Sequence, residues 1–304
     1  MKRIRSPLFY VGDKYKLMAQ LTELFPRKIN TFYDVFTGGG SASINTIANS
    51  YKINDIDKNV MKLHELLKKE SKDIEYFIYK MSRMIEKYNL SHSELGKNKE
   101  IELLKQTYKK TYFSIYNKEA YLNLRDDFNQ NQTNIELLYL LLVYGFNHMI
   151  RFNKKGDFNL PVGNVDWNKN VTCALRNYSD WINNNKVELY NSDFIYFVEQ
   201  NTYLEKDFLY FDPPYLISLS DYNKLWNENL EKRLYSLLDE LDKNNVKWGV
   251  SNLLKHKGKT NVILFEWAKK YNVYQIDSNY ISRFDNSIKE NSKELYVTNV
   301  KKGE

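Results

Sequence analysis

The stretch from residue 208 to residue 215, Phe-Leu-Tyr-Phe-Asp-Pro-Pro-Tyr, constrains the fold of this chain more than any other. Its first four residues are apolar or aromatic, which is typical of a strand that is buried on both faces of a sheet. Proline donates no N–H and restricts the residue before it, so the chain must leave the sheet in extended form. This predicts that Asp212 and Tyr215 lie at the carboxyl end of a strand, where open α/β sheets bind ligands. The structural alternative is an ordinary extended exit from the strand, and this stretch alone does not decide between the two.

A second strand-to-helix junction lies near the N-terminus. Residues 31–36 read as a strand, residues 37–41 as a Thr-Gly-Gly-Gly-Ser turn, and residues 41–48 as the start of a helix. Glycine permits positive φ and a close approach of a ligand to the backbone, and the first turn of a helix has free N–H groups. The spacing is not G-x-G-x-x-G, and no Gly-Lys-Ser/Thr is present, so a dinucleotide site and a P-loop are both disfavoured.

Two more predicted strands end in acidic residues. Residues 51–57 end in Asn-Asp-Ile-Asp, about where nucleotide-binding units place a carboxylate for ribose hydroxyls, and Asp55 is the candidate. Asp57 is expected to cap the next helix. Residues 187–190 are followed by Asn-Ser-Asp-Phe, where Asp193 either caps a helix over 194–200 or binds a ligand. Lys14 begins a predicted helix over 14–25, a position that the helix dipole disfavours, which leaves a ligand contact and a solvated surface lysine as alternatives.

Composition limits the number of domains, the partners and the cellular location that we expect for this protein. A chain of 304 residues can form two domains, and a net charge of +7 is compatible with a polyanionic partner. The single cysteine, Cys173, excludes an internal disulfide and a Cys-rich metal site, and four scattered histidines lead us to expect no metal. No apolar segment follows the basic start, and no run approaches the ~18 apolar residues of a membrane helix. We therefore expect a cytoplasmic protein without a membrane partner.

The middle of the chain predicts an inserted module. Residues 58–118 and 134–144 have helical periodicity without intervening strands. Two short strand-like runs then flank a Lys-Lys-Gly-Asp turn, which predicts a β-hairpin over 146–163. Its basic, amide and aromatic side chains suit entry into a DNA major groove, and the alternative is a surface hairpin that caps the helices.

Taken together, the Phe-Thr-Gly-Gly-Gly turn at 36–40, the segment Arg-Phe-Asn…Phe-Asn-Leu-Pro-Val-Gly at 151–163 and the Asp-Pro-Pro-Tyr at 212–215 resemble the Dam-type N6-adenine DNA methyltransferases. The order of the motifs is that of the alpha group of this D12 class, and the departures described below favour its restriction-modification branch. The resemblance implies a Rossmann-like S-adenosylmethionine-dependent methyltransferase sheet of class α/β. It also implies a catalytic domain made of residues 1–58 and 173–304, and a target-recognition domain over 59–172.

The resemblance also implies roles for individual residues. Asp212 and the carbonyl of Pro213 would accept the hydrogens of the exocyclic amine, and Tyr215 would stack on a target base that has left the duplex. S-adenosyl-L-methionine would bind at Tyr10, Gly12, Lys14, Phe36, Gly38, Gly40, Asp55, Ile56, Asp193 and Phe194. Duplex DNA would bind at Phe146, Asn147, Met149, Arg151, Asn153, Lys154, Lys155 and Pro161, with Arg151 at the position that reads guanine in relatives.

The target sequence does not follow from the resemblance. Relatives that read GATC usually carry Lys where Phe9 stands and Gly-Leu where His148 and Met149 stand. An N4-cytosine methyltransferase and, from another class, a non-catalytic DNA-binding module are the alternatives. An RNA substrate is disfavoured because an A-form major groove admits no hairpin. The expected partner is double-stranded DNA, bound by a monomer of bacterial or phage origin, and a cognate restriction endonuclease in the same system is compatible with this interpretation.

Overall fold

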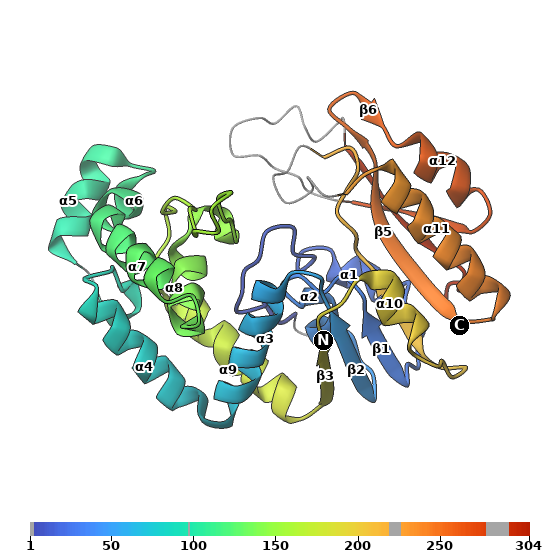
Figure 1. Cartoon of the computed structure of the whole chain (residues 1–304), viewed down its shortest axis with the longest axis horizontal. Coiled ribbons are helices and arrows are strands. Elements are labelled where there is room, and N and C mark those ends of the chain that lie inside the picture. The colour runs from blue at the N-terminus through green and yellow to red at the C-terminus, as the bar shows by residue number, and fades with distance from the viewer. Residues whose placement is uncertain (1–2, 97, 219–225, 278–291) are drawn as a thin grey trace. The chain divides into compact units, whose positions relative to one another are not determined.

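The computed structural model describes residues 3–96, 98–218, 226–277 and 292–304. The chain divides into two compact units (Figure 1). Unit 1 combines residues 1–3, 14–56 and 186–304, and unit 2 combines residues 4–13 and 57–185. The predicted border at residue 172 falls inside α9 (Lys169–Asn183), because one continuous amphipathic helix, capped by Asn168, runs across it.

Unit 1 is built on one mixed sheet with the strand order β3-β2-β1-β4-β5-β8-β7, and the short β6 pairs with β5. Strands β1 to β5 are parallel, whereas β8 runs antiparallel to both β5 and β7. The strands are β1 (Thr31–Asp34), β2 (Ser50–Asn54), β3 (Lys186–Tyr190), β4 (Phe208–Phe211), β5 (Lys247–His256), β6 (Lys259–Thr260), β7 (Asn272–Ile276) and β8 (Lys293–Thr298). The predicted α/β class is confirmed. The strand order reverses between β1 and β4, which is where open sheets of this kind bind ligands.

Helices cover one face of this sheet. They are α10 (Phe194–Glu199), α11 (Glu228–Lys243) and α12 (Val262–Ala268), and their apolar stripes pack on the central strands. The residues of this cluster on the strands or directly after β1 are Tyr33, Val35, Leu209, Phe211, Trp248, Val250, Leu254, Leu295 and Val297. Burial on both faces explains why β4 is a continuous apolar run.

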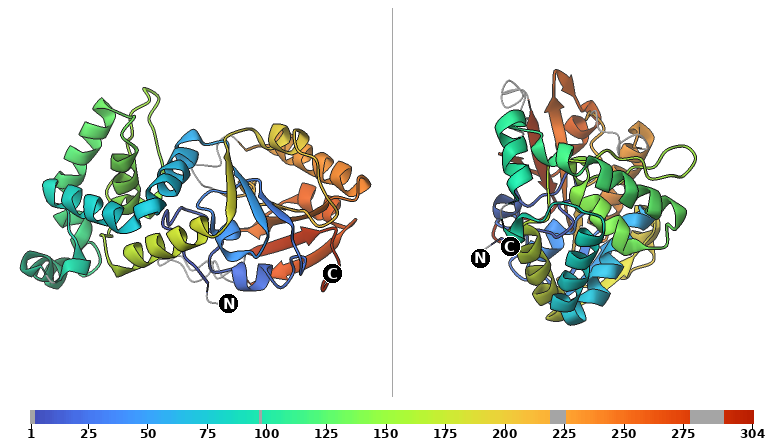
Figure 2. Two further views of the ribbon diagram at one scale, coloured as in Figure 1. Left: turned by 90° about the horizontal axis from the view of Figure 1, so that it is seen from below. Right: turned by 90° about the vertical axis from the view of Figure 1, so that its left-hand side faces the viewer.

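An aromatic cluster covers the opposite face. Phe25 contacts the rings of Phe32, Phe208 and Tyr210. In the left view of Figure 2, the strands of unit 1 lie between the yellow and orange helices and the blue segment that contains α1. The helix predicted over 14–25 is shorter than expected, since only α1 (Met18–Leu21) is regular and turns flank it.

Asn54, at the end of β2, connects three strand ends. Its side-chain amide donates to the carbonyl oxygens of Val35 and Ser192, at 3.1 and 3.0 Å. Its carbonyl oxygen accepts the backbone N–H of Ser192 at 3.0 Å. Asn54 is 1% exposed, so its side-chain amide is shielded from water. The amide therefore fixes the loops that follow β1 and β3 relative to β2.

Unit 2 is helical. Side-chain oxygens of Asp57, Asp73, Asn98, Asn134 and Asn168 accept backbone N–H groups at the starts of five of its helices, which confirms the predicted cap at Asp57. Its helices, apart from α9, are α3 (Lys58–Glu70), α4 (Ile74–Lys87), α5 (Lys99–Tyr108), α6 (Tyr112–Tyr116), α7 (Lys118–Gln130) and α8 (Ile135–Tyr144), with 3-10 turns η1 (Ser71–Asp73), η2 (Ser93–Leu95) and η3 (Phe146–His148). Every residue from 137 to 144 is buried, so α8 is the core of this unit.

The segment over 146–163, predicted as a β-hairpin, doubles back on itself without forming regular strands. Its two sides meet in isolated bridges at Gly145–Val162 and Phe152–Phe158. Residues 146–148 form η3 instead of a strand, because Asn147 and His148 have positive φ. The two ends approach so closely that a Cβ at Gly163 would lie 2.7 Å from the carbonyl oxygen of Gly145.

Among the residues described, no helix combines the length and the apolar character needed to span a bilayer.

Replacing Asn54 by Ala should lower the free energy of unfolding by about 1–3 kcal/mol, because the buried carbonyl of Val35 and the half-buried backbone groups of Ser192 lose their partner. Urea denaturation would measure this. Asn244→Ala is the matched control, since its amide is exposed and bonds only to the carbonyl of Glu240 at 2.9 Å. The control should change stability by less than about 0.5 kcal/mol, and an equal loss in both variants would contradict the role of Asn54.

Candidate active site

Asp212 lies directly after β4, at the carboxyl edge of the sheet, as predicted. Its Oδ1 forms an ion pair with the ammonium of Lys14 at 2.7 Å and accepts a hydrogen bond from the Tyr215 hydroxyl at 3.3 Å. The Asp212 side chain is 17% exposed and that of Lys14 is 8% exposed. Lys14 is thus a buried partner of the carboxylate, which excludes the solvated-lysine alternative.

Glu294, on β8, completes this cluster, and it is not among the site residues predicted from the sequence. Its carboxylate accepts the hydroxyl of Tyr215 at 2.7 Å and lies 3.9 Å from the Lys14 ammonium. The side chain is 1% exposed. One signal was available: a glutamate directly before the apolar run 295–298 has to be buried if that strand is internal to a sheet. We call Lys14, Asp212, Tyr215 and Glu294 the carboxylate cluster.

The charges in the carboxylate cluster oppose one another. Burial raises the pKa of Asp212 to about 6; the Lys14 ammonium lowers it, the Glu294 carboxylate raises it, and the hydrogen bond from Tyr215 lowers it. Asp34, at the end of β1, is also buried, and burial raises its pKa to about 7 although the hydroxyls of Ser43 and Thr37 donate to it. The site therefore contains two acids whose protonation changes close to neutral pH.

The glycine turn after β1 adopts the conformation that its sequence favours. Gly38 and Gly40 have φ of 47° and 78°, and α2 (Ser41–Asn45) starts after Gly40. Asp55 accepts the backbone N–H of Gly38 at 2.9 Å and so joins the end of β2 to this turn. The Ser41 hydroxyl is buried without a hydrogen-bond partner among the described residues. The turn, Asp55 and this hydroxyl therefore belong to one set of strand-end groups.

Of the other residues predicted to bind the cofactor, Ile56 is exposed, whereas Asp193 and Phe194 have structural roles. Ile56 is 67% exposed, so an apolar side chain faces solvent beside Asp55. Asp193 accepts the N–H of Ile195 at 3.0 Å, which makes it the cap of α10. Phe194 is 4% exposed and packs against Phe36, with 5.3 Å between ring centroids. Phe194 is therefore a core residue in this structure, and its predicted role against an adenine ring stays a prediction.

Tyr10 and Gly12 belong to unit 2, whereas Lys14 belongs to unit 1. The segment 4–13 is attached within unit 2, where the Tyr139 hydroxyl donates to the carbonyl of Pro7 at 3.1 Å. The ring of Phe9 lies 5.5 Å from that of His148. The structure therefore does not bring Tyr10 and Gly12 together with the glycine turn in one unit, and their cofactor role stays a prediction.

The residues predicted to bind DNA lie in unit 2, along the 146–163 segment. Phe146, Asn147, Lys154, Lys155 and Pro161 are exposed, and Met149 is half-buried. Two further positions are used internally. Arg151 donates to the side-chain and backbone oxygens of Asn159 at 2.9 and 2.8 Å, and Asn153 accepts the N–H groups of Lys155 and Asp157 at 2.8 and 3.0 Å.

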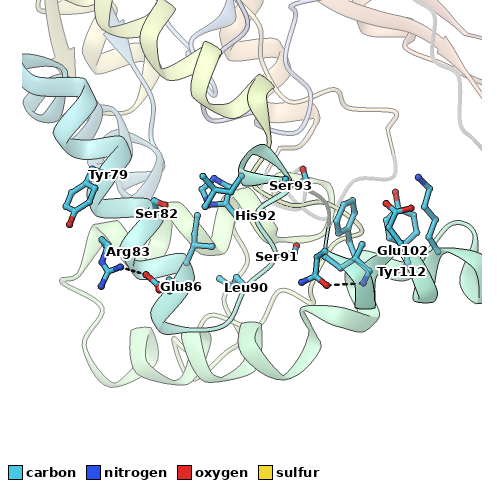
Figure 3. A pocket seen from close by; sticks show the side chains of 17 residues that line it. Tyr79, Ser82, Arg83, Glu86, Leu90, Ser91, His92, Ser93, Glu102 and Tyr112 are labelled. Carbon is cyan, nitrogen blue, oxygen red and sulfur yellow. Dashed lines mark hydrogen bonds and ion pairs between the residues drawn. The ribbon is translucent and has the colours of Figure 1, made fainter.

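Unit 2 also contains a pocket of about 760 Å³, between α4, η2, α5 and α6 (Figure 3). Its wall includes Arg83 in contact with Glu86, and also His92 and Tyr112. None of the residues predicted for the site lines it. The pocket is therefore distinct from the carboxylate cluster and from the 146–163 segment.

Comparison with known proteins identifies the family. Residues 10–281 match the model of a family described as D12 class N6 adenine-specific DNA methyltransferase. The chain is 33% identical to the type II methyltransferase M.FokI of Planomicrobium okeanokoites, over 97% of this chain and 43% of that protein. It is 30% identical to the modification methylase StsI of Streptococcus sanguinis, over 98% and 43%. It is also 28% identical to a DNA adenine methylase of Vibrio cholerae, over 54% and 49%.

The chain thus spans about 43% of the length of the first two relatives. The family match covers the glycine turn, residues 57–185 of unit 2 and the Asp-Pro-Pro-Tyr segment, in the order that the sequence predicted. On these findings, the chain belongs to the D12 class N6 adenine-specific DNA methyltransferases.

Proposed function

We propose that this chain transfers a methyl group from S-adenosyl-L-methionine to the N6 amino group of an adenine that is flipped out of a short target sequence in duplex DNA. The observation that carries the proposal is the Asp212 carboxylate, which is held by Lys14 and Tyr215 at the carboxyl end of β4. The restriction-modification setting of the relatives named above supports a modification role in such a system.

The strand-end groups beside the carboxylate cluster fit this cofactor. Asp55 has a carboxylate that can accept from ribose hydroxyls in addition to the N–H of Gly38. The exposed Ile56 offers apolar surface to an adenine ring. The buried Ser41 hydroxyl, without a partner among the residues described, would gain one from a polar group in the turn. When bound, the cofactor supplies an electrophilic methyl group.

The protein's task is to make a poor nucleophile react. The lone pair of an exocyclic adenine amine is delocalised into the ring, and a nitrogen whose two hydrogens are accepted by Asp212 and the Pro213 carbonyl becomes tetrahedral and directs its lone pair outward. Holding the reactants in line can contribute roughly 7–11 kcal/mol. Extrusion of the base costs a few kcal/mol.

The charges of the cluster suit this reaction. Positive charge develops on the attacking nitrogen, and the single ammonium of Lys14 cannot neutralise both Asp212 and Glu294. The excess negative charge would stabilise the nitrogen in the transition state, because preorganised charge acts strongly where water is excluded. Glu294 also fixes the hydroxyl of Tyr215, so the ring is held in place to stack on the target base.

We further propose that unit 2 recognises the target sequence through its 146–163 segment. Asn159 holds the guanidinium of Arg151 by two contacts. Arg has five N–H donors, so the remaining ones can reach O6 and N7 of guanine, the commonest specific contact in the major groove.

Asp212→Ala should abolish methyl transfer and leave binding of S-adenosyl-L-methionine within about twofold of wild type, because the carboxylate acts on the amine of the target base and is not among the groups proposed for the cofactor. Single-molecule sequencing of DNA from an expressing host would read the modification, and isothermal titration the binding. Asp126→Ala, which removes an exposed carboxylate of unit 2, is the control and should keep wild-type activity. N6-methyladenine at one short sequence would support the proposal, whereas N4-methylcytosine, no modified base, or full modification by Asp212→Ala would contradict it.

The pH dependence of methyl transfer should shift in opposite directions in two variants. Activity needs ionised Asp212, so it falls as the pH drops through the pKa of about 6. Glu294→Gln removes a charge that raises this pKa, so the acid limb moves to lower pH. Tyr215→Phe removes a hydrogen bond that lowers the pKa, so the limb moves to higher pH. Single-turnover rates between pH 5 and 8 would measure both shifts.

Titration of other groups near Asp212 would not shift the pH dependence in opposite directions in the two variants. Asp34 and Tyr210 feel its charge, but their hydroxyl partners are Thr37 and Ser43 for Asp34, and Ser251 for Tyr210. A limb governed by Asp34 would stay in place in both variants. Shifts in the same direction, or none, would therefore refute the assignment of the limb to Asp212.

Arg151→Ala should reduce discrimination at one base pair of the target by about 1–3 kcal/mol. Asn159→Ala should reduce it less, because one of the two contacts that hold Arg151 is to the backbone and remains. Methylation rates on a set of duplexes with single substitutions would measure both. Lys154→Ala is the control, since an exposed lysine that contacts phosphate would weaken binding equally on all sequences. A uniform loss in Arg151→Ala would make Arg151 a phosphate contact instead.

A further inference from the structure

Strand β5 extends well beyond the end of the neighbouring strand β4, which Asp212 follows. β4 ends at Phe211, which pairs with Val250, whereas β5 continues to His256. At ~3.3 Å per residue, this adds about 20 Å beyond the level at which Asp212 leaves the sheet. Strands β4 and β5 are parallel, so the extension points out from the edge that carries the carboxylate cluster.

The extension ends in a tight hairpin with β6, seen at the upper end of β5 in Figure 1. Lys255 pairs with Thr260 and His256 with Lys259. The two residues between them, Lys257 and Gly258, have φ of 48° and 77°. Positive φ at both central positions is typical of the type I′ turn, whose twist matches that of the strands it joins. The hairpin therefore presents its tip in a defined conformation.

Positive charge is concentrated on this hairpin. Lys255, Lys257 and Lys259 are exposed, and no acidic residue occurs between residues 251 and 261. Lys255 also lies directly opposite Lys293 of β8. Like charges in directly opposed positions of an antiparallel pair destabilise the sheet.

The repulsion between these lysines is not compensated within the described parts of the chain. No carboxylate there lies within ion-pair distance of Lys255, Lys257, Lys259 or Lys293. Several lysines on the helices of unit 1 do have such partners, for example Lys232 with Glu228 and Lys270 with Asp239. Within the described residues, the hairpin therefore retains uncompensated positive charge at the site edge.

We propose that the β5–β6 hairpin binds the phosphodiester backbone of duplex DNA and holds it over the carboxyl edge of unit 1. This inference rests on the proposed function and adds a DNA-binding element within the catalytic unit. Phosphates would relieve the repulsion between Lys255 and Lys293 and would release counterions. Lysine ammonium groups act as point charges, so the hairpin supplies affinity and position, and sequence recognition stays elsewhere.

The test replaces Lys255, Lys257 and Lys259 together by Gln. The control replaces Lys206, Lys243 and Lys302 by Gln; these are equally exposed but lie near the amino ends of β4 and β5 or beyond β8. Fluorescence anisotropy with a labelled duplex of arbitrary sequence, between 50 and 300 mM NaCl, gives the slope of log Kd against log salt. Single-turnover methylation at saturating DNA and urea unfolding are measured on the same proteins.

The slope should fall by about 0.9 for each phosphate that the hairpin variant no longer neutralises, and it should be unchanged in the control. The methylated sequence should stay as in wild type, because phosphate contacts carry no base information. The urea midpoint should rise, because the repulsion with Lys293 is removed, which separates the effect from misfolding. An unchanged slope, or an equal fall in both variants, would overturn the proposal. Absence of methylation by wild type would instead refute the proposed function, and the wild-type measurement tells the two failures apart.

Discussion

The carboxylate cluster depends on one buried ammonium, that of Lys14, which lies between the carboxylates of Asp212 and Glu294. Among the described residues, Lys14 alone pairs with both Asp212 and Glu294, and the three side chains are at most 17% exposed. Burying charge is costly unless each charge is paired and hydrogen-bonded. The position of Lys14 therefore determines how much negative charge remains at the end of β4, and through it how basic Asp212 is. The Tyr215 hydroxyl connects the two carboxylates and makes the arrangement a single unit.

The sheet topology brings these groups together from distant parts of the chain. The strand order reverses between β1 and β4, so Asp34 and Asp212 end adjacent strands. β8 returns antiparallel beside β5 and delivers Glu294 to the same edge. Asn54 fixes the neighbouring loops that carry the candidate cofactor groups. The carboxylate cluster and the groups proposed for the cofactor thus lie along one edge of the sheet.

The role of a residue could be predicted from the sequence where that role depends on residues close by in the chain. Two prolines force the exit after Asp212, and Asp57 and Asp193 cap helices because of what directly follows them. Glu294 was not predicted as a site residue because its partner Tyr215 lies 79 positions away in the sequence. The 146–163 segment was misjudged as a regular hairpin because alternation cannot reveal the positive φ at Asn147 and His148. The length of β5 depended on pairing with β8 and β6, which composition does not disclose.

The close approach of Gly145 and Gly163 has a consequence for how such enzymes diversify. The segment between them begins and ends at one point, where backbone N–H groups of Phe146 and Gly163 donate to the carbonyls of Pro161 and Tyr144. The exposed residues of the loop can therefore be exchanged without disturbing the helices that support it, whereas Phe158 and Leu160 are buried and belong to that support. If the loop recognises DNA as proposed, specificity for a new target sequence could evolve by substitutions within residues 146–163. The carboxylate cluster at the sheet edge would not have to change.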